Sequence, residues 1–341
     1  CRKRELSMTQ DRYSRQILFN KIGEKGQEDL RQAQVLIVGM GALGTHLAEG
    51  LVRAGVKQLT IVDRDYIEYS NLQRQTLFTE QDAAEGLPKV IAAKAHLESI
   101  DKDVQIHAFI AQVDRAFLSS NGTHVDLILD ATDNFVTRQL INDFCYQQHI
   151  PWIYGGVVQS TYVEAPFIPG KTPCFNCLIP QLPSMTLTCD TVGVIQPAVT
   201  MTTSLQLKDA LKILTHQDIA AKLTYGDIWE GQHISIGFSK IQQDNCATCG
   251  TAANYPYLQQ QPQRYAMLCG RDTVQYVNPD ISQEMLVSYL GARQIDYQTN
   301  GYLVMFHFNK YRIVCFHDGR FLIHGMTNIT QATKLINALF G

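Results

Sequence analysis

The stretch Val35-Leu-Ile-Val-Gly-Met-Gly-Ala-Leu-Gly44 decides the fold of this chain. An apolar run ends at three glycines spaced G-x-G-x-x-G, and a helix-like segment, 45–54, follows, so the predicted order is strand, tight turn, helix. In this pattern Gly39 permits the turn, Gly41 lets the backbone approach a phosphate or ribose, and Gly44 lets the helix pack closely on the strand. Free N–H groups at the helix start then face the ligand.

A second apolar run, Leu59-Thr-Ile-Val-Asp63, extends this pattern to a nucleotide-binding βαβ unit. The run ends in Asp63, where a carboxylate can accept hydrogen bonds from both ribose hydroxyls. The glycine pattern alone is a weak signal, because glycines also serve turns and close packing without any ligand. The strand before, the helix after and the acid beyond favour a nucleotide without specifying which one.

The composition indicates a globular protein of about two domains. The chain has 341 residues, 45% of them hydrophobic, and a formal net charge of −3, which gives no electrostatic reason to expect nucleic acid or an anionic membrane as a partner. No apolar run approaches the roughly 20 residues of a membrane span, and the basic start, 1–4, has no apolar segment behind it. We therefore expect a cytoplasmic protein, with Met8 as a candidate native start.

The chain divides into two parts. Segments 35–155 alternate between strand-like and helix-like patterns, and from Gly156 the pattern changes to short strands of antiparallel type. A composition shift after Tyr255-Pro-Tyr257 marks a boundary. The predicted fold is α/β: a Rossmann-like nucleotide-binding sheet continued by antiparallel strands in residues 1–254, followed by a small α+β domain in residues 255–341.

Polar residues beyond the predicted strand ends form one candidate site, because ligands of parallel sheets bind at the carboxyl ends of the strands. They share an ability to bind ribose, phosphate or metal: Asp63, Asn71, Arg74, Lys89, Asp130 and Asp133. Arg74 and Lys89 can neutralise a polyphosphate, and Asp133 can hold a Mg²⁺ ion that bridges its oxygens. Each has a simpler explanation when taken alone, since a lone Arg or Lys is usually a solvated charge and Asp133 beside Asn134 fits a helix cap.

Four cysteines occur as two Cys-x-x-Cys pairs, Cys174 with Cys177 and Cys246 with Cys249. Four thiolates suit a tetrahedral structural zinc site with no open coordination position. The long gap between the pairs leaves redox dithiols as the alternative, but neither pair sits at a helix start after a strand in the thioredoxin manner. We therefore predict structural zinc.

Several motifs occur in one order between Asp11 and Gly250: Arg12-Tyr-Ser-Arg-Gln16, the three glycines, Asp63-x-Asp65, Ser70-Asn-Leu-Gln-Arg-Gln75, Pro88-Lys89, Asp130-Ala-Thr-Asp-Asn134 and the two Cys-x-x-Cys pairs. The joint pattern resembles the ThiF/MoeB (HesA) family of adenylyltransferases, relatives of the ubiquitin-activating enzymes. The resemblance implies that ATP and Mg²⁺ activate the C-terminal Gly-Gly carboxylate of a small ubiquitin-like sulfur carrier protein as its acyl-adenylate, releasing pyrophosphate. Thiamine and molybdopterin carriers fit equally, because the activation step is chemically the same.

The resemblance also implies a role for each motif residue. Asp63 is expected to hold the ribose. Asn71, Arg74 and Lys89 are expected to hold the phosphates. Asp133 is expected to bind Mg²⁺.

Two further roles follow from the resemblance and reach beyond the nucleotide unit. In the family the arginine that matches Arg15 reaches the triphosphate from the partner subunit, which implies a homodimer with shared sites; an arm that folds back on its own chain fits this sequence equally. Cys189 matches a cysteine proposed to take part in sulfur or thioester transfer. An ordinary loop cysteine is the alternative, and Asp190 beside it disfavours the thiolate.

Two other functions use the same elements. An NAD-dependent oxidoreductase would use the glycines and Asp63, but it leaves Arg74, Lys89 and Asp133 without a shared task. A non-catalytic module that binds nucleotide or carrier would be favoured by a missing phosphate-binding cation, and none is missing. We therefore predict a nucleotidyltransferase, with no chemistry assigned to the C-terminal domain.

Overall fold

The strand that precedes the glycines lies inside a large sheet. The computed structural model describes residues 12–179, 192–260, 264–268 and 272–340, and within them an eight-stranded sheet has the order β3-β2-β1-β4-β5-β6-β7-β8. β1 (Gln34–Val38) pairs in parallel with β2 (Gln58–Asp63) and with β4 (Leu127–Asp130). Its paired residues are almost all apolar, because helices cover both faces of a parallel sheet.

The sheet changes from parallel to antiparallel at β5. Its other strands are β3 (Gln105–Ile110), β5 (Trp152–Val158), β6 (Thr161–Phe167), β7 (Lys222–Asp227) and β8 (Ile234–Gly237). β2 pairs in parallel with β3, and β4 with β5, whereas β6, β7 and β8 continue the sheet in antiparallel pairs. This confirms the predicted Rossmann-like sheet with an antiparallel continuation.

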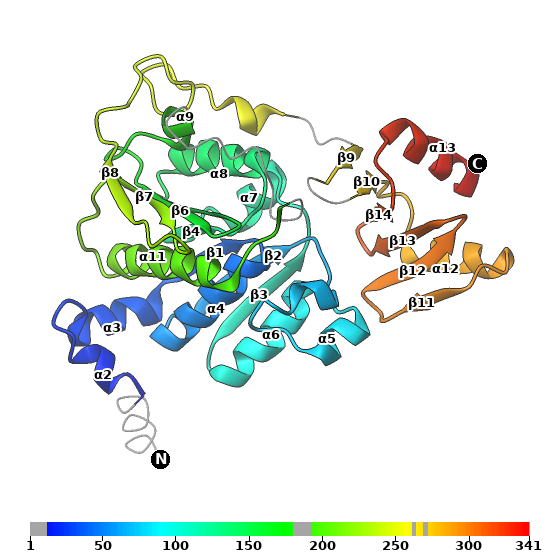
Figure 1. Cartoon of the computed structure of the whole chain (residues 1–341), viewed down its shortest axis with the longest axis horizontal. Helices are drawn as coiled ribbons and strands as arrows, with labels where there is room; N and C mark the ends of the chain where they lie inside the picture. The colour runs from blue at the N-terminus through cyan, green and yellow to red at the C-terminus, as the bar shows by residue number, and fades with distance from the viewer. Residues whose placement is uncertain (1–11, 180–191, 261–263, 269–271, 341) are drawn as a thin grey trace. The chain divides into compact units, whose positions relative to one another are not determined.

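Helices cover both faces of this sheet (Figure 1). α4 (Ala42–Ala54), α6 (Lys89–Ile100) and α11 (Gln196–Leu214) lie on one face, and α7 (Arg115–Asn121) and α8 (Phe135–Gln148) lie on the other. Because the parallel strands run in one direction, the carboxyl ends of β1, β2 and β4 meet at one edge. No helix among the described residues is long and apolar enough to span a membrane.

Shorter elements complete the larger unit. They are α2 (Ser14–Ile17), α3 (Gly23–Gln32), η1 (Tyr69–Asn71), α5 (Glu80–Glu85), α9 (Phe175–Leu178) and η3 (Pro256–Gln259). η1 and α5 lie in the connection between β2 and α6, the segment that also carries Asn71 and Arg74.

An aromatic cluster packs the antiparallel strands against α9. The Trp152 and Phe167 rings stack at a centroid distance of 4.7 Å, and the Phe175 ring meets them edge-on at 5.7 and 5.9 Å. All three side chains are fully buried, which contributes about 1.5–3 kcal/mol for each phenylalanine. Phe175 directly follows Cys174, so this cluster fixes the position of the first cysteine pair.

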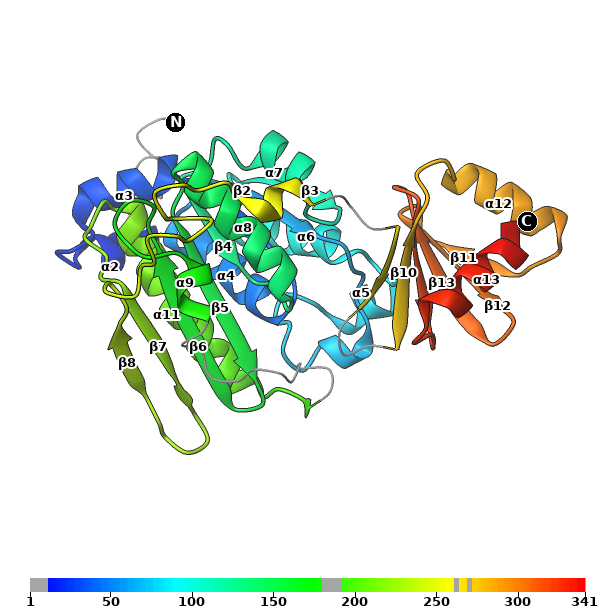
Figure 2. The ribbon, with the colours of Figure 1, turned by 90° about the horizontal axis from the view of Figure 1, so that it is seen from above.

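The chain beyond Gln260 forms a second compact unit. Its described residues make a six-stranded antiparallel sheet, β11-β12-β13-β14-β10-β9, with α12 and α13 packed against it (Figure 2). The elements are β9 (Tyr265–Met267), β10 (Thr273–Val277), α12 (Gln283–Ala292), β11 (Tyr297–Thr299), β12 (Leu303–Phe308), β13 (Tyr311–Phe316), β14 (Arg320–His324) and α13 (Ile329–Phe340). The predicted small α+β class of this domain is confirmed.

Candidate functional site

The turn after β1 requires glycine at two positions for different reasons. Gly39 has φ +97°, and a Cβ there would lie 2.6 Å from the Ala131 carbonyl oxygen. A Cβ on Gly44 would lie 2.0 Å from the Gly39 carbonyl oxygen, so α4 can pack on the turn only with glycine at this position. Gly41 is different, because the nearest atom to a Cβ there is Gln75 Nε2 at 3.7 Å. Packing within the chain leaves room at Gly41, as a ligand-facing position requires.

The Asp63 carboxylate fastens the end of β2 to this turn. Its Oδ2 accepts the Met40 N–H at 2.6 Å, and its Oδ1 accepts the Asp65 N–H at 2.7 Å. Each oxygen keeps a second lone pair. Asp63 is therefore held rigidly at the carboxyl edge of the sheet and can still accept hydrogen bonds from a ribose.

Asn71 is buried and keeps one polar group for a ligand. Its Oδ1 accepts the Glu68 N–H at 3.0 Å in a capping box that starts η1. The Nδ2 group donates to no described residue, so it is the part of the side chain that can reach a phosphate oxygen. Arg74, one turn further on, is partly exposed and donates to the Ser70 carbonyl oxygen at 3.0 Å.

Lys89 is far more buried than a surface lysine. It begins α6 with only 3% of its area exposed, and its Nζ lies 3.5 Å from Asp65 Oδ2. Lysine is almost never fully buried without an anionic partner. A solvated surface charge is therefore the wrong explanation for Lys89.

The two acids after β4 have different environments. Asp130 is fully buried and paired with Arg138 Nε at 3.0 Å, and its other oxygen accepts from Thr132. Burial raises the pKa of Asp130, and the Arg138 charge and the Thr132 hydrogen bonds act against that rise. Asp130 therefore serves the structure, and Arg138, which the sequence analysis missed, anchors it.

Asp133 is exposed and accepts no hydrogen bond from any described residue. The helix cap belongs to its neighbour Asn134, whose Oδ1 accepts the Thr137 N–H at 2.8 Å. The cap explanation is thus wrong for Asp133. The segment that carries Asp133 also lies against the glycine turn, because Ala131 is the residue that a Cβ on Gly39 would strike.

The arm that carries Arg15, residues 12–19, packs against the end of α4 that is opposite the glycine turn. The Arg15 guanidinium is exposed and contacts no described residue through a hydrogen bond or ion pair. The Tyr13 ring packs beside Gly55, where a Cβ would lie 3.1 Å from it. Gly55 ends α4 and Gly41 begins it, so 13 residues of helix, or about 20 Å, separate arm and turn.

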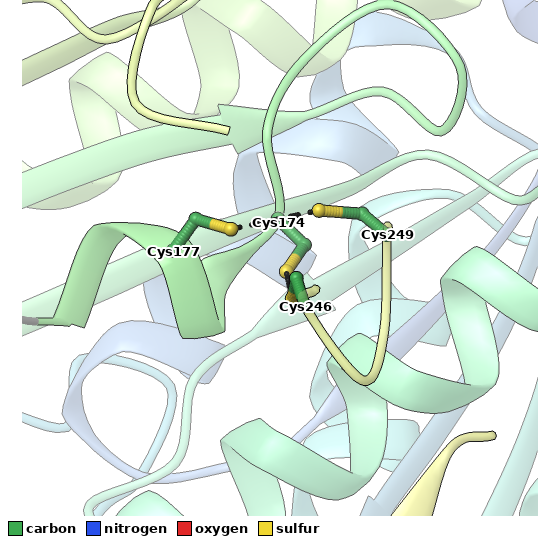
Figure 3. Close-up of side chains that lie close together, drawn as sticks. All are labelled: Cys174, Cys177, Cys246 and Cys249. Carbon is green, nitrogen blue, oxygen red and sulfur yellow. Dashed lines mark hydrogen bonds between the residues drawn. The ribbon is translucent and has the colours of Figure 1, made fainter. Parts of the chain in front are cut away.

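The four cysteines of the two Cys-x-x-Cys pairs meet in space (Figure 3), and we call them the cysteine cluster. Their four Sγ atoms all lie within 4.8 Å of one another, with Cys174 to Cys246 at 3.5 Å and Cys177 to Cys249 at 3.6 Å. The neighbouring Cys249 thiol and burial raise the pKa of Cys174, and burial raises the pKa of Cys177 to about 11.

Two adjacent residues of α8 hold the cysteine cluster together. Asn142 Oδ1 accepts the Phe175 N–H at 2.9 Å, next to Cys174. The Asp143 carboxylate accepts the Thr248 hydroxyl, which lies between the second pair of cysteines, and the Tyr257 N–H at 2.8 Å. Burial raises the pKa of Asp143, and these two hydrogen bonds act against the rise. The sequence analysis missed both residues.

The structure thus gathers most of the predicted residues at one edge. The glycine turn, Asp63, the segment of Asn71 and Arg74, Lys89 and the segment of Asp133 all lie at or follow the carboxyl ends of β1, β2 and β4. Arg15 is not brought to them within its own chain. Cys189 and Asp190 lie outside the described residues, so the role of Cys189 stays a prediction.

This fold and site define a nucleotide-binding protein with a Rossmann-like sheet and an attached cysteine cluster. The sequence model of the ThiF family matches residues 13–249. The chain therefore belongs to the ThiF family, which confirms the resemblance seen in the motifs.

Named relatives of this chain are adenylyltransferases. It is 40% identical over 334 residues to the sulfur carrier protein ThiS adenylyltransferase of Bacillus subtilis (strain 168), covering 97% of this chain and 99% of the relative. It is 35% identical over 248 residues to the molybdopterin-synthase adenylyltransferase of Salmonella typhimurium, covering 70% of this chain and 96% of the relative. The first match includes the C-terminal unit, and the second has no room for it.

A solved structure shares the fold of the larger unit. The crystal structure of E. coli MccB with ATP has a TM-score of 0.61 and 23% sequence identity, covering 70% of this chain and 74% of that one. At this identity the likeness supports the architecture alone.

Substitution of two glycines should separate a packing role from a ligand-facing role. Gly44→Ala places a methyl group against the Gly39 carbonyl, and we expect a loss of about 1–3 kcal/mol from overpacking. Gly41→Ala makes only an ordinary contact, with Gln75 Nε2 at 3.7 Å, and should keep a melting temperature close to that of the unaltered chain. Thermal unfolding of both variants checks this, and equal destabilisation of the two would contradict it.

Proposed function

We propose that this chain adenylates the C-terminal carboxylate of a small sulfur carrier protein with ATP and releases pyrophosphate. The observation that carries the proposal is the gathering of the glycine turn, Asp63, Lys89 and Asp133 at one edge of the sheet. Family membership and the names of the relatives support the same reaction. An NAD-dependent oxidoreductase gives the buried Lys89 no task.

The reaction needs positioning and charge more than acid–base chemistry. A carboxylate oxygen of the carrier attacks the α-phosphorus in line, and the bond from that phosphorus to the pyrophosphate oxygen breaks. Both reactants are anions, so the cations Arg74 and Lys89 stabilise the transition state by neutralising the triphosphate. Asn71 Nδ2 donates to a phosphate oxygen, and Asp63 orients the ribose.

Asp133 would hold a Mg²⁺ ion. Its carboxylate is exposed and is not used for capping, and the segment that carries it lies against the glycine turn, which suits a hard cation that keeps several waters. The ion would supply further charge neutralisation at the triphosphate.

The carrier is best described as ThiS-like. The relative that matches this chain over nearly its full length is named for ThiS, whereas the molybdopterin relative matches 70% of the chain. A Gly-Gly end on the carrier is part of the proposal, since two residues without side chains let a backbone approach a phosphate closely. We assign the adenylation and zinc site to residues 1–254, leave residues 255–341 as a domain of unknown role, and place the protein in the cytoplasm.

The active unit is a homodimer in this proposal. The Arg15 side chain makes no hydrogen bond or ion pair with a described residue of its own chain, and it lies about one helix length, roughly 20 Å, from the glycine turn. Leu18 and Phe19, which directly follow α2, are 73% and 55% exposed. A second copy would cover these side chains and receive Arg15 at its own ATP, as an arginine finger supplied in trans.

The cysteine cluster would hold a structural zinc ion. Four sulfur atoms within 4.8 Å suit tetrahedral Cys₄ coordination, and four protein ligands leave no open position for catalysis. Cys189, outside this set, remains the candidate for sulfur or thioester transfer after adenylation.

Removing one charged ligand of the triphosphate should abolish adenylate formation in a folded protein. For Asp133→Asn or Arg74→Ala we expect ATP–pyrophosphate exchange, measured with carrier, to fall by about 10²–10³. Glu80→Gln, an exposed charge in α5, is a control that should retain activity. Near-normal exchange in a folded Asp133→Asn or Arg74→Ala variant would refute the assigned roles.

One zinc ion should be bound per chain through the cysteine cluster. Cys177→Ser should lose zinc and thermal stability, because the metal joins α9 to the loop after β8. Cys189→Ser is the control that should keep zinc. Metal analysis and melting curves test this prediction. Stable disulfides within each Cys-x-x-Cys pair, found by mass mapping, would refute zinc binding by the cysteine cluster.

Mixing two inactive variants should restore activity if Arg15 acts in trans. An Arg15→Ala chain and an Asp133→Asn chain form a heterodimer with one whole site, so random reassortment restores up to about a quarter of site activity. If Arg15 acted within its own chain, no site would be whole. Chains that exchange subunits, as shown by native mass spectrometry, and still remain inactive would count against a shared site.

A further inference from the structure

One buried carboxylate holds the start of the arm before α3 to the rest of its subunit. Asp101, 3% exposed at the end of α6, pairs with Arg12 at 2.9 Å and with Lys57. The same oxygen accepts the Tyr13 hydroxyl at 3.3 Å, and the other accepts the Asp103 N–H at 3.0 Å. Burial alone would raise the pKa of Asp101, but the Lys57 and Asp103 hydrogen bonds and the two cations hold it below its usual value.

The other contacts of the arm fix the direction in which it points. Gln16 Nε2 donates to the Ala54 carbonyl at 2.8 Å and to Gln27 Oε1 at 2.7 Å, so this side of α2 faces the end of α4. The Arg12 guanidinium also reaches the Ile100 carbonyl at 3.4 Å. Arg15 is left on the outward side, where no described group holds it.

We propose that Asp101 is a positioning residue that presents Arg15 to the ATP bound by the partner subunit. The inference rests on the proposed sharing of Arg15, and it deepens that proposal by naming what fixes the arm. Asp101 does not act on the nucleotide of its own subunit, because α6 puts 12 residues, or about 18 Å, between it and Lys89. A loosened arm would deliver the same guanidinium to a wider range of positions.

Asp101→Asn removes the charge while keeping the size of the side chain. A misplacement of about 1 Å can cost about 10²-fold in rate, so we expect kcat for adenylate formation to fall by roughly 10- to 100-fold. Glu49→Gln is the matched control, since Glu49 pairs with Arg53 at 2.7 Å on the surface of α4 and does not touch the arm. The control should keep the full rate.

Subunit mixing shows on which side of the dimer Asp101 acts. An Asp101→Asn chain mixed with an Asp133→Asn chain should regain up to about a quarter of site activity. In the mixed dimer, one site has the intact Asp133 of the Asp101→Asn chain and receives the intact arm of the Asp133→Asn chain. An Asp101→Asn chain mixed with an Arg15→Ala chain should regain none, because both arms are defective. A role of Asp101 in its own nucleotide site predicts the reverse pattern, which would overturn the proposal.

Arg12 provides a second route, because its side chain is half exposed and its loss should not unfold the protein. Arg12→Ala should reproduce the Asp101→Asn mixing pattern, and Arg12→Lys, which keeps the ion pair, should recover most of the rate. A defect in Arg12→Lys equal to that of Arg12→Ala would argue against anchoring by charge.

Trypsin gives a readout that does not depend on activity. Cleavage after Arg15, followed by mass spectrometry, should be roughly tenfold faster in Asp101→Asn than in the unaltered chain or in Glu49→Gln, because a released arm becomes accessible to protease. Unchanged cleavage would overturn the anchoring role. If Arg15→Ala and Asp133→Asn chains failed to complement each other, the shared site would fail, and cleavage alone would still decide whether Asp101 holds the arm.

Discussion

The carboxylate of Asp63 connects the elements at the carboxyl ends of β1, β2 and β4, which we call the nucleotide edge. Its Oδ2 accepts the Met40 N–H and so joins the end of β2 to the turn after β1, where the Gly39 N–H also donates to the Val62 carbonyl oxygen at 2.8 Å. Asp63 Oδ1 accepts the Asp65 N–H and holds the start of the loop after β2. The glycine turn also packs against the segment after β4, because Gly39 lies against Ala131. The residue that we propose to bind the ribose thus also helps to set the geometry of the glycine turn.

The sequence predicted the parts of the site that lie in local patterns. Gly39, Gly44 and Asp63 act within a strand-turn-helix unit whose spacing is visible in one window, and the sheet with its antiparallel continuation followed from the alternation of elements. Residues that bond distant segments were missed: Arg138 reaches the carbonyl of Gly155, and Asp143 reaches Thr248. Their partners are set only by tertiary packing, because a polar residue on a predicted helix gives no sign of which loop it will meet.

The helices of the parallel half connect two opposite ends of the subunit. α4 runs from Gly41 at the nucleotide edge to Gly55 beside the arm, and α6 runs from Lys89 to Asp101. One end of each helix lies at the nucleotide edge. The other end contacts the arm that carries Arg15, which is too far away to reach the nucleotide edge of its own subunit. In the proposed homodimer, an arginine held in this way would meet the second copy rather than its own subunit's site, which is consistent with the docking of α2 at the far end of α4.

α8 makes a comparable connection on the other face of the sheet. Asn134, next to Asp133, caps the first turn of α8. Arg138, one turn later, pairs with the buried Asp130. Asn142 and Asp143, about one further turn along, bind the segments that carry the two pairs of the cysteine cluster. A metal in the cluster would therefore stabilise the same helix whose start sets the position of Asp133. Four protein ligands would leave that metal no open position for catalysis. Its loss would still affect the position of Asp133, because α8 joins the cysteine cluster to the segment of Asp133.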